Sequence, residues 1–257
     1  IVCTVTENNK PVAPEMLFQL QCRICFCRIL RQNLQPLIAA VNVLGKNTSE
    51  LFLQNFASRG KLLRIINAGE IKNLRNINSF LQGHPDMKGT PGVDMTTGSL
   101  GLGFSAACGM ALAAKIDNKS HRVYAIVGDG ESQEGQIWEA AMFAAHYKLD
   151  NLCLIIDWNG LQIDGPVAEV MNPTPHDKKL EAFGFNVISI DGHDFEEIDN
   201  AFKAAKAVKG KPTAIIAKTI KGKGVSFMEN QVSWHGSAPN DEQYEKAVAE
   251  ITASITK

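Results

Sequence analysis

Short apolar runs alternate with longer amphipathic segments over the second half of the chain. Four runs are rich in Val and Ile, as is typical of strands that are covered on both faces, and they span residues 123–127, 152–156, 186–190 and 213–217. Amphipathic segments at 134–148 and 194–208 lie between them, and the second repeats apolar residues at helical spacing. This alternation predicts an α/β fold with a mostly parallel central sheet and helices on both faces.

Further helices are expected outside this alternating region. Residues 104–115 are rich in Ala, Met and Leu and predict a buried helix, and a tail helix is expected from about Asp241. Asp194 is the expected N-cap of the helix at 194–208, with Glu197 three residues later. Residues 1–75 are irregular, with helical stretches at 17–30 and 37–44. We therefore divide the chain into a divergent, largely helical N-terminal segment, 1–75, and an α/β domain, 76–257.

A polar residue follows each of the first two strands of the alternating region. Asp129 stands in Gly128-Asp129-Gly130, and Asn159 comes thirty residues later, followed by Leu161. Ligands of parallel sheets bind beyond the carboxyl ends of the strands. Asp and Asn are also ordinary turn residues, but two of them after the two strands of one strand–helix–strand unit favour a metal–diphosphate site. Asp129, Asn159 and the backbone carbonyl of Leu161 would bind Mg²⁺, which prefers oxygen ligands and is commonly shared with phosphates.

Two glycine-rich segments give weaker signals. Residues 96–103 include Gly98, Leu100 and Gly101 and precede the helix at 104–115, so free backbone N–H groups could meet an anion or a ring there. Lys221-Gly222-Lys223-Gly224 follows the last strand and could bind a phosphate. For both segments an ordinary turn is the alternative.

Two histidines stand in loops beside Gly or Pro. His84 lies in Gln82-Gly83-His84-Pro85, where the proline restrains it to an extended conformation. His235 lies in Trp234-His235-Gly236-Ser237. Both are candidates for proton transfer or for binding substrate hydroxyls, and a surface histidine is the alternative. The other four histidines are interpreted as structural or solvent-facing.

Composition and charge exclude several classes of function. The formal net charge of −1 gives no reason to expect nucleic acid or an anionic membrane as a partner. No apolar run approaches the ~20 residues of a membrane helix. Six cysteines in 257 residues are too sparse for a secreted disulfide scaffold, which favours the cytoplasm. Cys22, Cys25 and Cys27 lack a clear fourth zinc ligand, so idle thiols are preferred to a metal site.

Longer runs of sequence around these residues resemble transketolase. Gly128-Asp129-Gly130 followed after thirty residues by Asn159 is similar to the thiamine diphosphate fingerprint. The similarity extends over 81–87, 97–101, 128–136, 138–141, 159–165 and 235–239. Over about residues 76–250 the chain resembles the N-terminal, diphosphate-binding section of the family, as found in split two-subunit versions.

The resemblance implies a cofactor, roles for individual residues and a reaction. Thiamine diphosphate would be held through Mg²⁺ (Ca²⁺ is also possible) bound by Asp129, Asn159 and the Leu161 carbonyl. Gly128 and Gly130 would lie at the diphosphate, and the backbone of Gly98 and Leu100 would contact the aminopyrimidine. His84 and His235 would face the reacting carbons. The implied reaction moves a two-carbon ketol unit from a ketose phosphate to an aldose phosphate.

The resemblance also implies a partner chain. A full-length transketolase continues into a pyrimidine-binding domain whose glutamate activates the cofactor, and no glutamate here can be assigned to that task. We therefore expect the partner to be a C-terminal transketolase subunit, in a dimer of heterodimers, and no activity of this chain alone. Residues 1–75 depart from the family, because its Ser-x-Gly-His motif is expected near Leu51, where the chain reads Thr48-Ser49-Glu50-Leu51-Phe52. Ser58-Arg59-Gly60-Lys61 has a similar shape, but Lys61 stands in place of the histidine. We interpret this departure as a disrupted reading frame or a wrongly assigned sequence, in preference to real divergence.

Two other functions remain open. One is a related thiamine diphosphate enzyme, such as 1-deoxyxylulose-phosphate synthase or the first component of a 2-oxo acid dehydrogenase, although the loops of His84 and His235 suit sugar-phosphate transfer better. The other is a non-catalytic homologue that keeps the fold without the reaction.

Overall fold

The computed structural model describes residues 5–7, 70, 73–84, 86–91 and 93–255. The chain divides into two compact units, one formed by Ile1–Phe18 and Thr97–Thr219 and the other by Gln19–Thr96 and Ile220–Lys257. The helices expected at 17–30 and 37–44 and the cluster of Cys22, Cys25 and Cys27 lie outside the described residues. The division at residue 75 stays a prediction.

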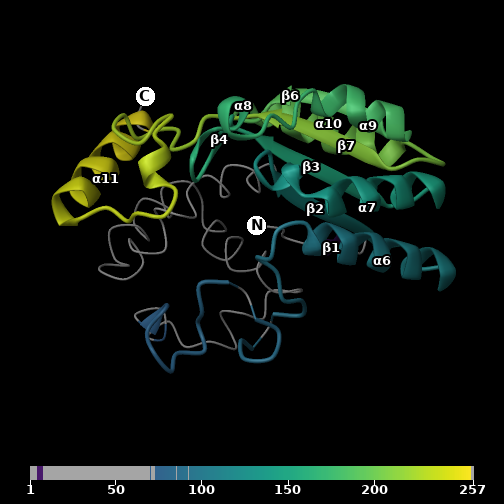
Figure 1. The fold of residues 1–257 in the computed structure, drawn as a ribbon, viewed down its shortest axis with the longest axis horizontal. Coiled ribbons are helices and arrows are strands. Elements are labelled where there is room, and N and C mark those ends of the chain that lie inside the picture. The colour runs from purple at the N-terminus through teal and green to yellow at the C-terminus, as the bar shows by residue number, and fades with distance from the viewer. Residues whose placement is uncertain (1–4, 8–69, 71–72, 85, 92, 256–257) are drawn as a thin grey trace. The chain divides into compact units, whose positions relative to one another are not determined.

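The first unit is built on a five-stranded sheet with the order β1-β2-β3-β7-β6 (Figure 1). The four expected strands are all present, as β2 (Arg122–Gly128), β3 (Leu152–Trp158), β6 (Asn186–Asp191) and β7 (Thr213–Lys218). These four run parallel, whereas the short edge strand β1 (Val5–Glu7) pairs antiparallel with β2. The predicted mostly parallel sheet is confirmed.

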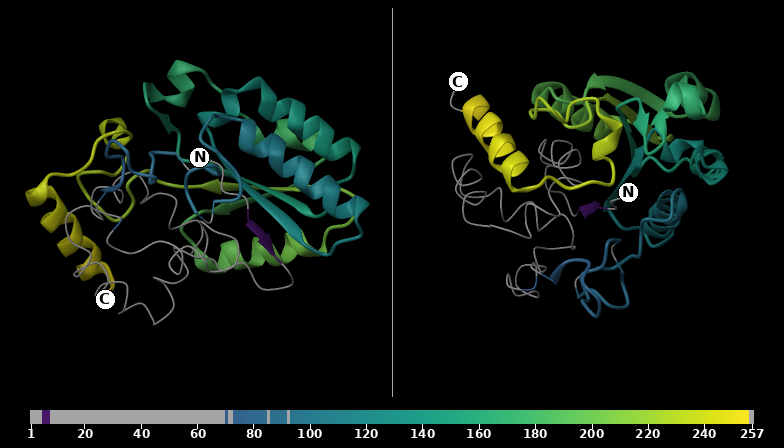
Figure 2. Two further views of the ribbon diagram at one scale, coloured as in Figure 1. Left: turned by 90° about the horizontal axis from the view of Figure 1, so that it is seen from below. Right: turned by 60° about the vertical axis from the view of Figure 1, so that its left-hand side comes forward.

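Alternate residues of the strands enter two different layers of the core. Val123, Ala125 and Val127 of β2 and Leu154 and Ile156 of β3 pack on one face with α6 (Leu102–Ile116), α7 (Gly135–His146) and α9 (His176–Phe183). The residues between them point to the other face, where the Tyr124 ring meets the Phe202 ring of α10 edge-on with centroids 5.7 Å apart. Helices therefore cover both faces, as Figure 2 shows for α10 opposite α6 and α7, and this explains why the strands are apolar throughout.

The three longer helices of this unit follow the predicted periodicity. They are α6 (Leu102–Ile116), α7 (Gly135–His146) and α10 (Phe195–Ala207), with buried residues on one stripe of each. The Asp194 side chain caps α10 by accepting the N–H groups of Glu196 and Glu197, as predicted. The Glu197 carboxylate accepts the N–H of Asp191 at 2.7 Å and so holds the loop that leads into α10. The N–H of the cap residue, Asp194, is therefore left to another partner.

Several short elements between β3 and β6 were not predicted. They are the hairpin strands β4 (Leu161–Gln162) and β5 (Gly165–Pro166) and the helices α8 (Val167–Val170) and α9 (His176–Phe183). Each is at most eight residues long, too short for an apolar repeat to be read from the sequence.

The second unit contains loops, the short helix η3 (Val232–Trp234) and the predicted tail helix α11 (Asp241–Ile255). Val225, Met228 and Ala247 form a small core there, onto which Trp234 and Ile251 pack. The Trp234 ring nitrogen donates to the carbonyl of Phe227 at 3.0 Å. This contact holds the loop that leads to His235.

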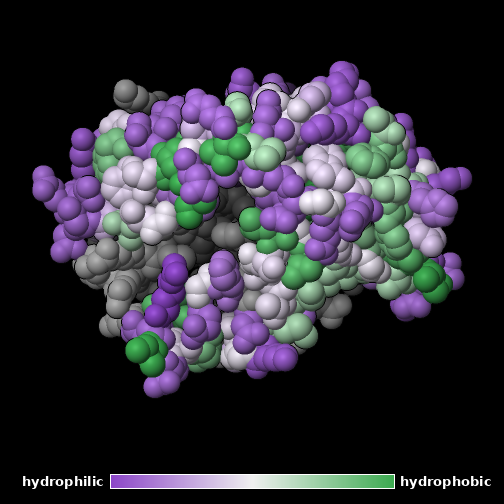
Figure 3. Space-filling view, in the orientation of Figure 1, coloured by the Kyte–Doolittle hydropathy of each residue, from purple (hydrophilic) through white to green (hydrophobic). Residues whose placement is uncertain are grey.

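Side chains of large apolar residues are exposed on α6 and α7 in the first unit. Ile116 near the end of α6 and Met142 and Phe143 of α7 are 69%, 57% and 37% exposed, and Tyr147 follows directly after α7. Figure 3 shows apolar side chains gathered over these two helices, on the right of the view. Among the described residues, no helix has the length and hydropathy of a membrane span.

Candidate functional site

The pairing of β2 with β3 places the two predicted metal ligands at one edge of the sheet. Gly128 faces Asp157 in the parallel register, so both strands end at the same level. The N–H of Asp129 donates to the carbonyl of Asp157 at 3.2 Å, one residue beyond that pair. Asp129 and Asn159 therefore follow neighbouring strands at their carboxyl ends, as the sequence predicts.

Backbone amides hold the Asp129 carboxylate in place. Asp129 is 1% exposed, its Oδ1 accepts the N–H of Gly130 at 2.8 Å, and its Oδ2 accepts the N–H of Gly160 at 2.5 Å. In the same turn the side-chain Oδ1 of Asn159 accepts the N–H of Leu161 at 3.0 Å. These bonds join the loop after β2 to the loop after β3, and they bring Asp129, Gly130, Asn159 and Leu161 together.

The third predicted ligand, the carbonyl of Leu161, lies in the β4–β5 hairpin opposite Pro166. Proline has no N–H, so the hairpin ladder provides no donor from Pro166 to that carbonyl. One carboxylate, one side-chain amide and one backbone carbonyl are oxygen donors that suit Mg²⁺ or Ca²⁺. No group of three or more His, Cys, Asp or Glu that could hold a metal occurs in the described part of the chain. A site with a single carboxylate is compatible with that absence.

The glycine-rich turn before α6 is tied to the end of β2 by a residue that the sequence reasoning missed. Glu131 is 5% exposed; its Oε1 accepts the N–H of Gly101 at 2.9 Å, and its Oε2 accepts the N–H of Gly128 at 3.3 Å. Gly98 and Gly101 have φ angles of 117° and 82°, in the left-handed region that favours glycine. A carboxylate between two glycine amides thus fixes the turn that contains Gly98 and Leu100. The sequence offered one sign of this role, because Glu131 directly follows Gly128-Asp129-Gly130.

Gly130 lies close to the β4–β5 hairpin. A Cβ added to Gly130 would lie 3.0 Å from the Cβ of Gln162, closer than ordinary van der Waals contact. The backbone of Gly130 therefore approaches the hairpin as closely as glycine alone permits without displacement. The predicted contacts of Gly128, Gly130, Gly98 and Leu100 with a cofactor stay predictions.

Two buried polar side chains, Ser132 and His176, hold the loop that contains Asp129. The Ser132 hydroxyl donates to the carbonyl of Asp129 at 2.5 Å, and its Oγ lies 2.9 Å from Nε2 of His176. His176 is 2% exposed, which agrees with its interpretation as a structural histidine. Burial, and then the nearby Lys179 ammonium, lower the pKa of His176 from 6.5 to about 4. The imidazole is therefore neutral at pH 7.

His84 and His235 lie in the other compact unit. The His84 side chain is exposed, in a loop where the Asp86 carboxylate accepts the N–H groups of Lys88 and Gly89. His235 is half-buried, with its Nδ1 3.4 Å from Nζ of Lys221. The roles of the two histidines in proton transfer and substrate binding stay predictions.

Lys221-Gly222-Lys223-Gly224, the other candidate phosphate site, is a packed turn. Gly222 has a φ of 75°, and a Cβ there would lie 2.5 Å from the carbonyl oxygen of Met228, so the glycine is needed for packing. Lys223 lies 3.9 Å from the Glu229 carboxylate. These contacts explain the glycine and lysine of the segment as parts of an ordinary turn.

Comparison with known proteins identifies the family. Residues 63–252 match the family model described as transketolase, thiamine diphosphate binding domain. The chain is 49% identical over 181 residues to the 6-deoxy-6-sulfo-D-fructose transketolase subunit of Clostridium sp. strain MSTE9. It is 45% identical over 184 residues to an apulose-4-phosphate transketolase subunit of Phocaeicola vulgatus. These matches cover 70% and 72% of this chain and 66% and 65% of the two relatives.

Full-length transketolases are similar over a smaller share of their length. The human enzyme is 46% identical over 187 residues, which is 72% of this chain and 29% of that protein. The transketolase structure from Campylobacter jejuni superposes with a TM-score of 0.71 at 31% identity, covering 91% of this chain and 42% of that one. The transketolase from Leishmania mexicana gives a TM-score of 0.70 at 26% identity, with 96% and 42% covered. Because the family model spans most of its residues, this chain belongs to the transketolase family and contains its thiamine diphosphate-binding domain.

Proposed function

We propose that this chain is the thiamine diphosphate- and Mg²⁺-binding subunit of a split transketolase, which transfers a two-carbon ketol unit between sugar phosphates. The observation that carries the proposal is the buried carboxylate of Asp129. It is fixed by the amides of Gly130 and Gly160 beside Asn159, at the carboxyl ends of β2 and β3. A preorganised oxygen cluster of this kind suits a divalent cation that is shared with a diphosphate.

The residues of this chain would bind and orient the cofactor. Asp129, Asn159 and the carbonyl of Leu161 would hold the metal, and the turn of Gly98 and Leu100 would meet the aminopyrimidine through its backbone. When bound, thiamine diphosphate supplies the electron sink that breaking a ketose carbon–carbon bond requires. His84 and His235 would bind substrate hydroxyls and move protons at the reacting carbons.

Two findings support the requirement for a partner chain. The two bacterial relatives are named as transketolase subunits, and this chain covers about two thirds of the length of each. Exposed apolar side chains on α7, Met142 and Phe143, are candidates for a contact with that partner. The partner would be a C-terminal subunit with the pyrimidine-binding domain, in a dimer of heterodimers in the cytoplasm.

Calorimetric titration with thiamine diphosphate and Mg²⁺ tests cofactor binding directly, with the partner subunit present. Asp129→Asn should weaken binding at least tenfold, because it removes the only carboxylate of the proposed ligand set. Asp164→Asn is the matched control, since Asp164 is an exposed residue of the β4–β5 turn. Equal binding by the wild type and the Asp129 variant would refute the metal site.

An activity assay tests the reaction and the partner. Ketol transfer from xylulose 5-phosphate to ribose 5-phosphate should require both chains, thiamine diphosphate and Mg²⁺ together. Full activity of this chain alone would refute the partner requirement. Turnover of pyruvate in its place would favour the related thiamine diphosphate enzymes, and cofactor binding without any turnover would favour a non-catalytic homologue.

A further inference from the structure

The Glu131 carboxylate connects two turns of the candidate site that are distant in sequence. Its Oε1 accepts the N–H of Gly101 at 2.9 Å, in the turn before α6, and its Oε2 accepts the N–H of Gly128 at 3.3 Å, at the end of β2. Glu131 is 5% exposed, so water competes little for these bonds. One buried side chain therefore spans the turn that would meet the aminopyrimidine and the turn that would meet the diphosphate.

The backbone of Glu131 is held separately from these two contacts. Glu131 begins the short helix η2 (Glu131–Gln133), and its carbonyl accepts the N–H of Glu134 at 3.1 Å. The next residue, Ser132, is buried and donates to the carbonyl of Asp129. The carboxylate is thus attached to the same turn as the proposed metal ligand, and a movement of that turn is passed through the side chain to the turn before α6.

A purely structural role explains only part of this arrangement. Gly101 is the N-cap residue of α6 and has no side chain that could cap the helix, so the Glu131 carboxylate takes the place of a cap near the positive end of the helix dipole. Capping requires only the contact with Gly101. It does not require the second oxygen to bind Gly128, the residue next to Asp129.

Two other contacts of α6 fix the helix rather than the turn. Phe104 is buried in the core, and the Ser105 hydroxyl accepts Nε2 of Gln136 from α7 at 2.8 Å. The turn itself contains Gly98 and Gly101, both with positive φ, and the backbone of glycine has wide conformational freedom. A fixed partner is therefore needed to hold this turn in one conformation.

We propose that Glu131 is a positioning residue that sets the spacing between the two ends of the bound cofactor. The inference rests on the proposed function, because it assumes that the diphosphate lies at Asp129 and the aminopyrimidine at the turn before α6. A ligand that is held at both ends gains most affinity when the two subsites already lie at the matching distance. Glu131 maintains that distance through the amides of Gly101 and Gly128, and hydrogen bonds to a carboxylate are stronger than those to a neutral acceptor.

Calorimetric titrations with two ligands, in the presence of Mg²⁺ and the partner subunit, test this role. Thiamine diphosphate would contact both turns, whereas inorganic pyrophosphate would contact only the turn of Asp129. Glu131→Ala should weaken the binding of thiamine diphosphate at least tenfold and that of pyrophosphate less than threefold. Glu131→Gln keeps the length of the side chain and one acceptor, so it should recover part of the loss, and it carries the comparison if the alanine variant does not fold.

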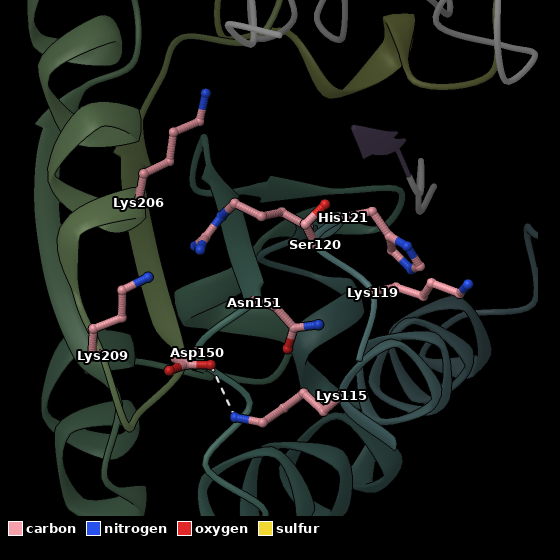
Figure 4. Close-up of a pocket in the computed structure, with 9 residues that line it drawn as sticks. Lys115, Lys119, Ser120, His121, Asp150, Asn151, Lys206 and Lys209 are labelled. Carbon is pink, nitrogen blue, oxygen red and sulfur yellow. Dashed lines mark hydrogen bonds and ion pairs between the residues drawn. The ribbon is translucent and has the colours of Figure 1, made fainter. Parts of the chain in front are cut away.

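Asp150→Ala is the matched control, at the opposite edge of the sheet. Asp150 precedes β3, and its carboxylate also joins separate segments, because one oxygen lies 2.9 Å from Nζ of Lys115 and the other accepts the N–H of Gly210 at 3.0 Å. Figure 4 shows Asp150 and Lys115 joined by a dashed line in a cavity of about 400 Å³. This variant should be less stable but should change the affinity for thiamine diphosphate less than twofold.

Amide hydrogen exchange of the full chain tests the connection between the two turns directly. In the wild type, Mg²⁺ with pyrophosphate should slow the exchange of the Gly101 N–H at least threefold, although pyrophosphate would lie at Asp129. Glu131→Ala should abolish this slowing. Slowing in both proteins would overturn the proposal, as would equal affinity losses for the two ligands or equal losses in the Glu131 and Asp150 variants.

Failure of this role is distinguishable from failure of the proposed function. Equal affinity of the wild type and Glu131→Ala for thiamine diphosphate would refute the role of Glu131 alone. A wild-type chain that binds no thiamine diphosphate with its partner present would refute the proposed function and, with it, this role.

Discussion

Acidification should destabilise this protein through the buried imidazole of His176. The Ser132 hydroxyl donates its proton to the carbonyl of Asp129, so its oxygen must accept from Nε2–H of His176. The neutral imidazole therefore carries its proton on Nε2. Its Nδ1 is buried and has no hydrogen-bond partner among the described residues. A second proton on Nδ1 would place an uncompensated charge in the interior.

The pKa values give the size and the pH range of the effect. The pKa of His176 is lowered to about 4 in the folded state, against 6.5 for an ordinary histidine. The unfolded chain therefore binds the proton first, and stability is complete above pH 6.5, falls as the pH drops toward 4, and levels off below that. The full shift corresponds to about 3 kcal/mol, of which about 2 kcal/mol is lost by pH 5.

Urea denaturation at pH 8, 7, 6 and 5, followed by tryptophan fluorescence and circular dichroism, measures this loss. The Trp158 ring lies 6.2 Å from the His176 ring between centroids, which provides a nearby fluorescence probe. Carboxylates also titrate in this range, so the His176→Gln variant isolates the histidine contribution. The variant should lose about 2 kcal/mol less than the wild type between pH 8 and pH 5.

The matched control is His146→Gln, because His146 lies nearer the surface, at the end of α7. It should follow the wild-type pH dependence closely. If the stability difference between the wild type and His176→Gln is the same at pH 8 and pH 5, a neutral, buried imidazole does not contribute to the pH dependence, and the reasoning fails.

One further prediction concerns Gly130, which lies beside the candidate site, and a second concerns Asp194, the N-cap of α10. Gly130→Ala should lower the free energy of unfolding by about 1 kcal/mol, because the added Cβ would press against Gln162. Gly135→Ala is the control, since nothing lies within 4 Å of its added Cβ, and it should be neutral or stabilising by up to about 1 kcal/mol. Equal effects of the two alanines in urea denaturation would refute the close contact at Gly130. Asp194→Ala should cost about 1 kcal/mol in the same assay by removing the cap of α10, and Asp194→Asn should restore most of it; an alanine variant as stable as the wild type would contradict the capping role.

The strands and long helices were predictable because their apolar residues repeat over enough positions to define a period. All four predicted strands are present, and α7 begins and ends within two residues of the predicted helix. The short α9 was missed, since its eight residues include only Leu180 and His176 as buried positions. Local patterns of that length do not distinguish a helix from a loop.

The candidate site was only partly predictable. Asp129 and Asn159 could be paired from the sequence because parallel strands of one strand–helix–strand unit end at the same edge. Glu131 and His176 were not singled out from the sequence, because what mainly distinguishes them is burial against partners that are distant in sequence. Glu131 reaches back 30 residues to Gly101, and His176 lies 44 residues from Ser132.

The sequence by itself determined the alternation of strands and helices, the two candidate oxygen ligands after β2 and β3, and the resemblance to the transketolase family. These features depend on residue type and spacing, which the chain carries locally. Only the tertiary structure decided which carboxylates are buried, which amides hold them, and that Glu131 joins the turn before α6 to the end of β2. Such groupings depend on strand order and register, and these follow from the packing of the whole sheet rather than from any short stretch of sequence.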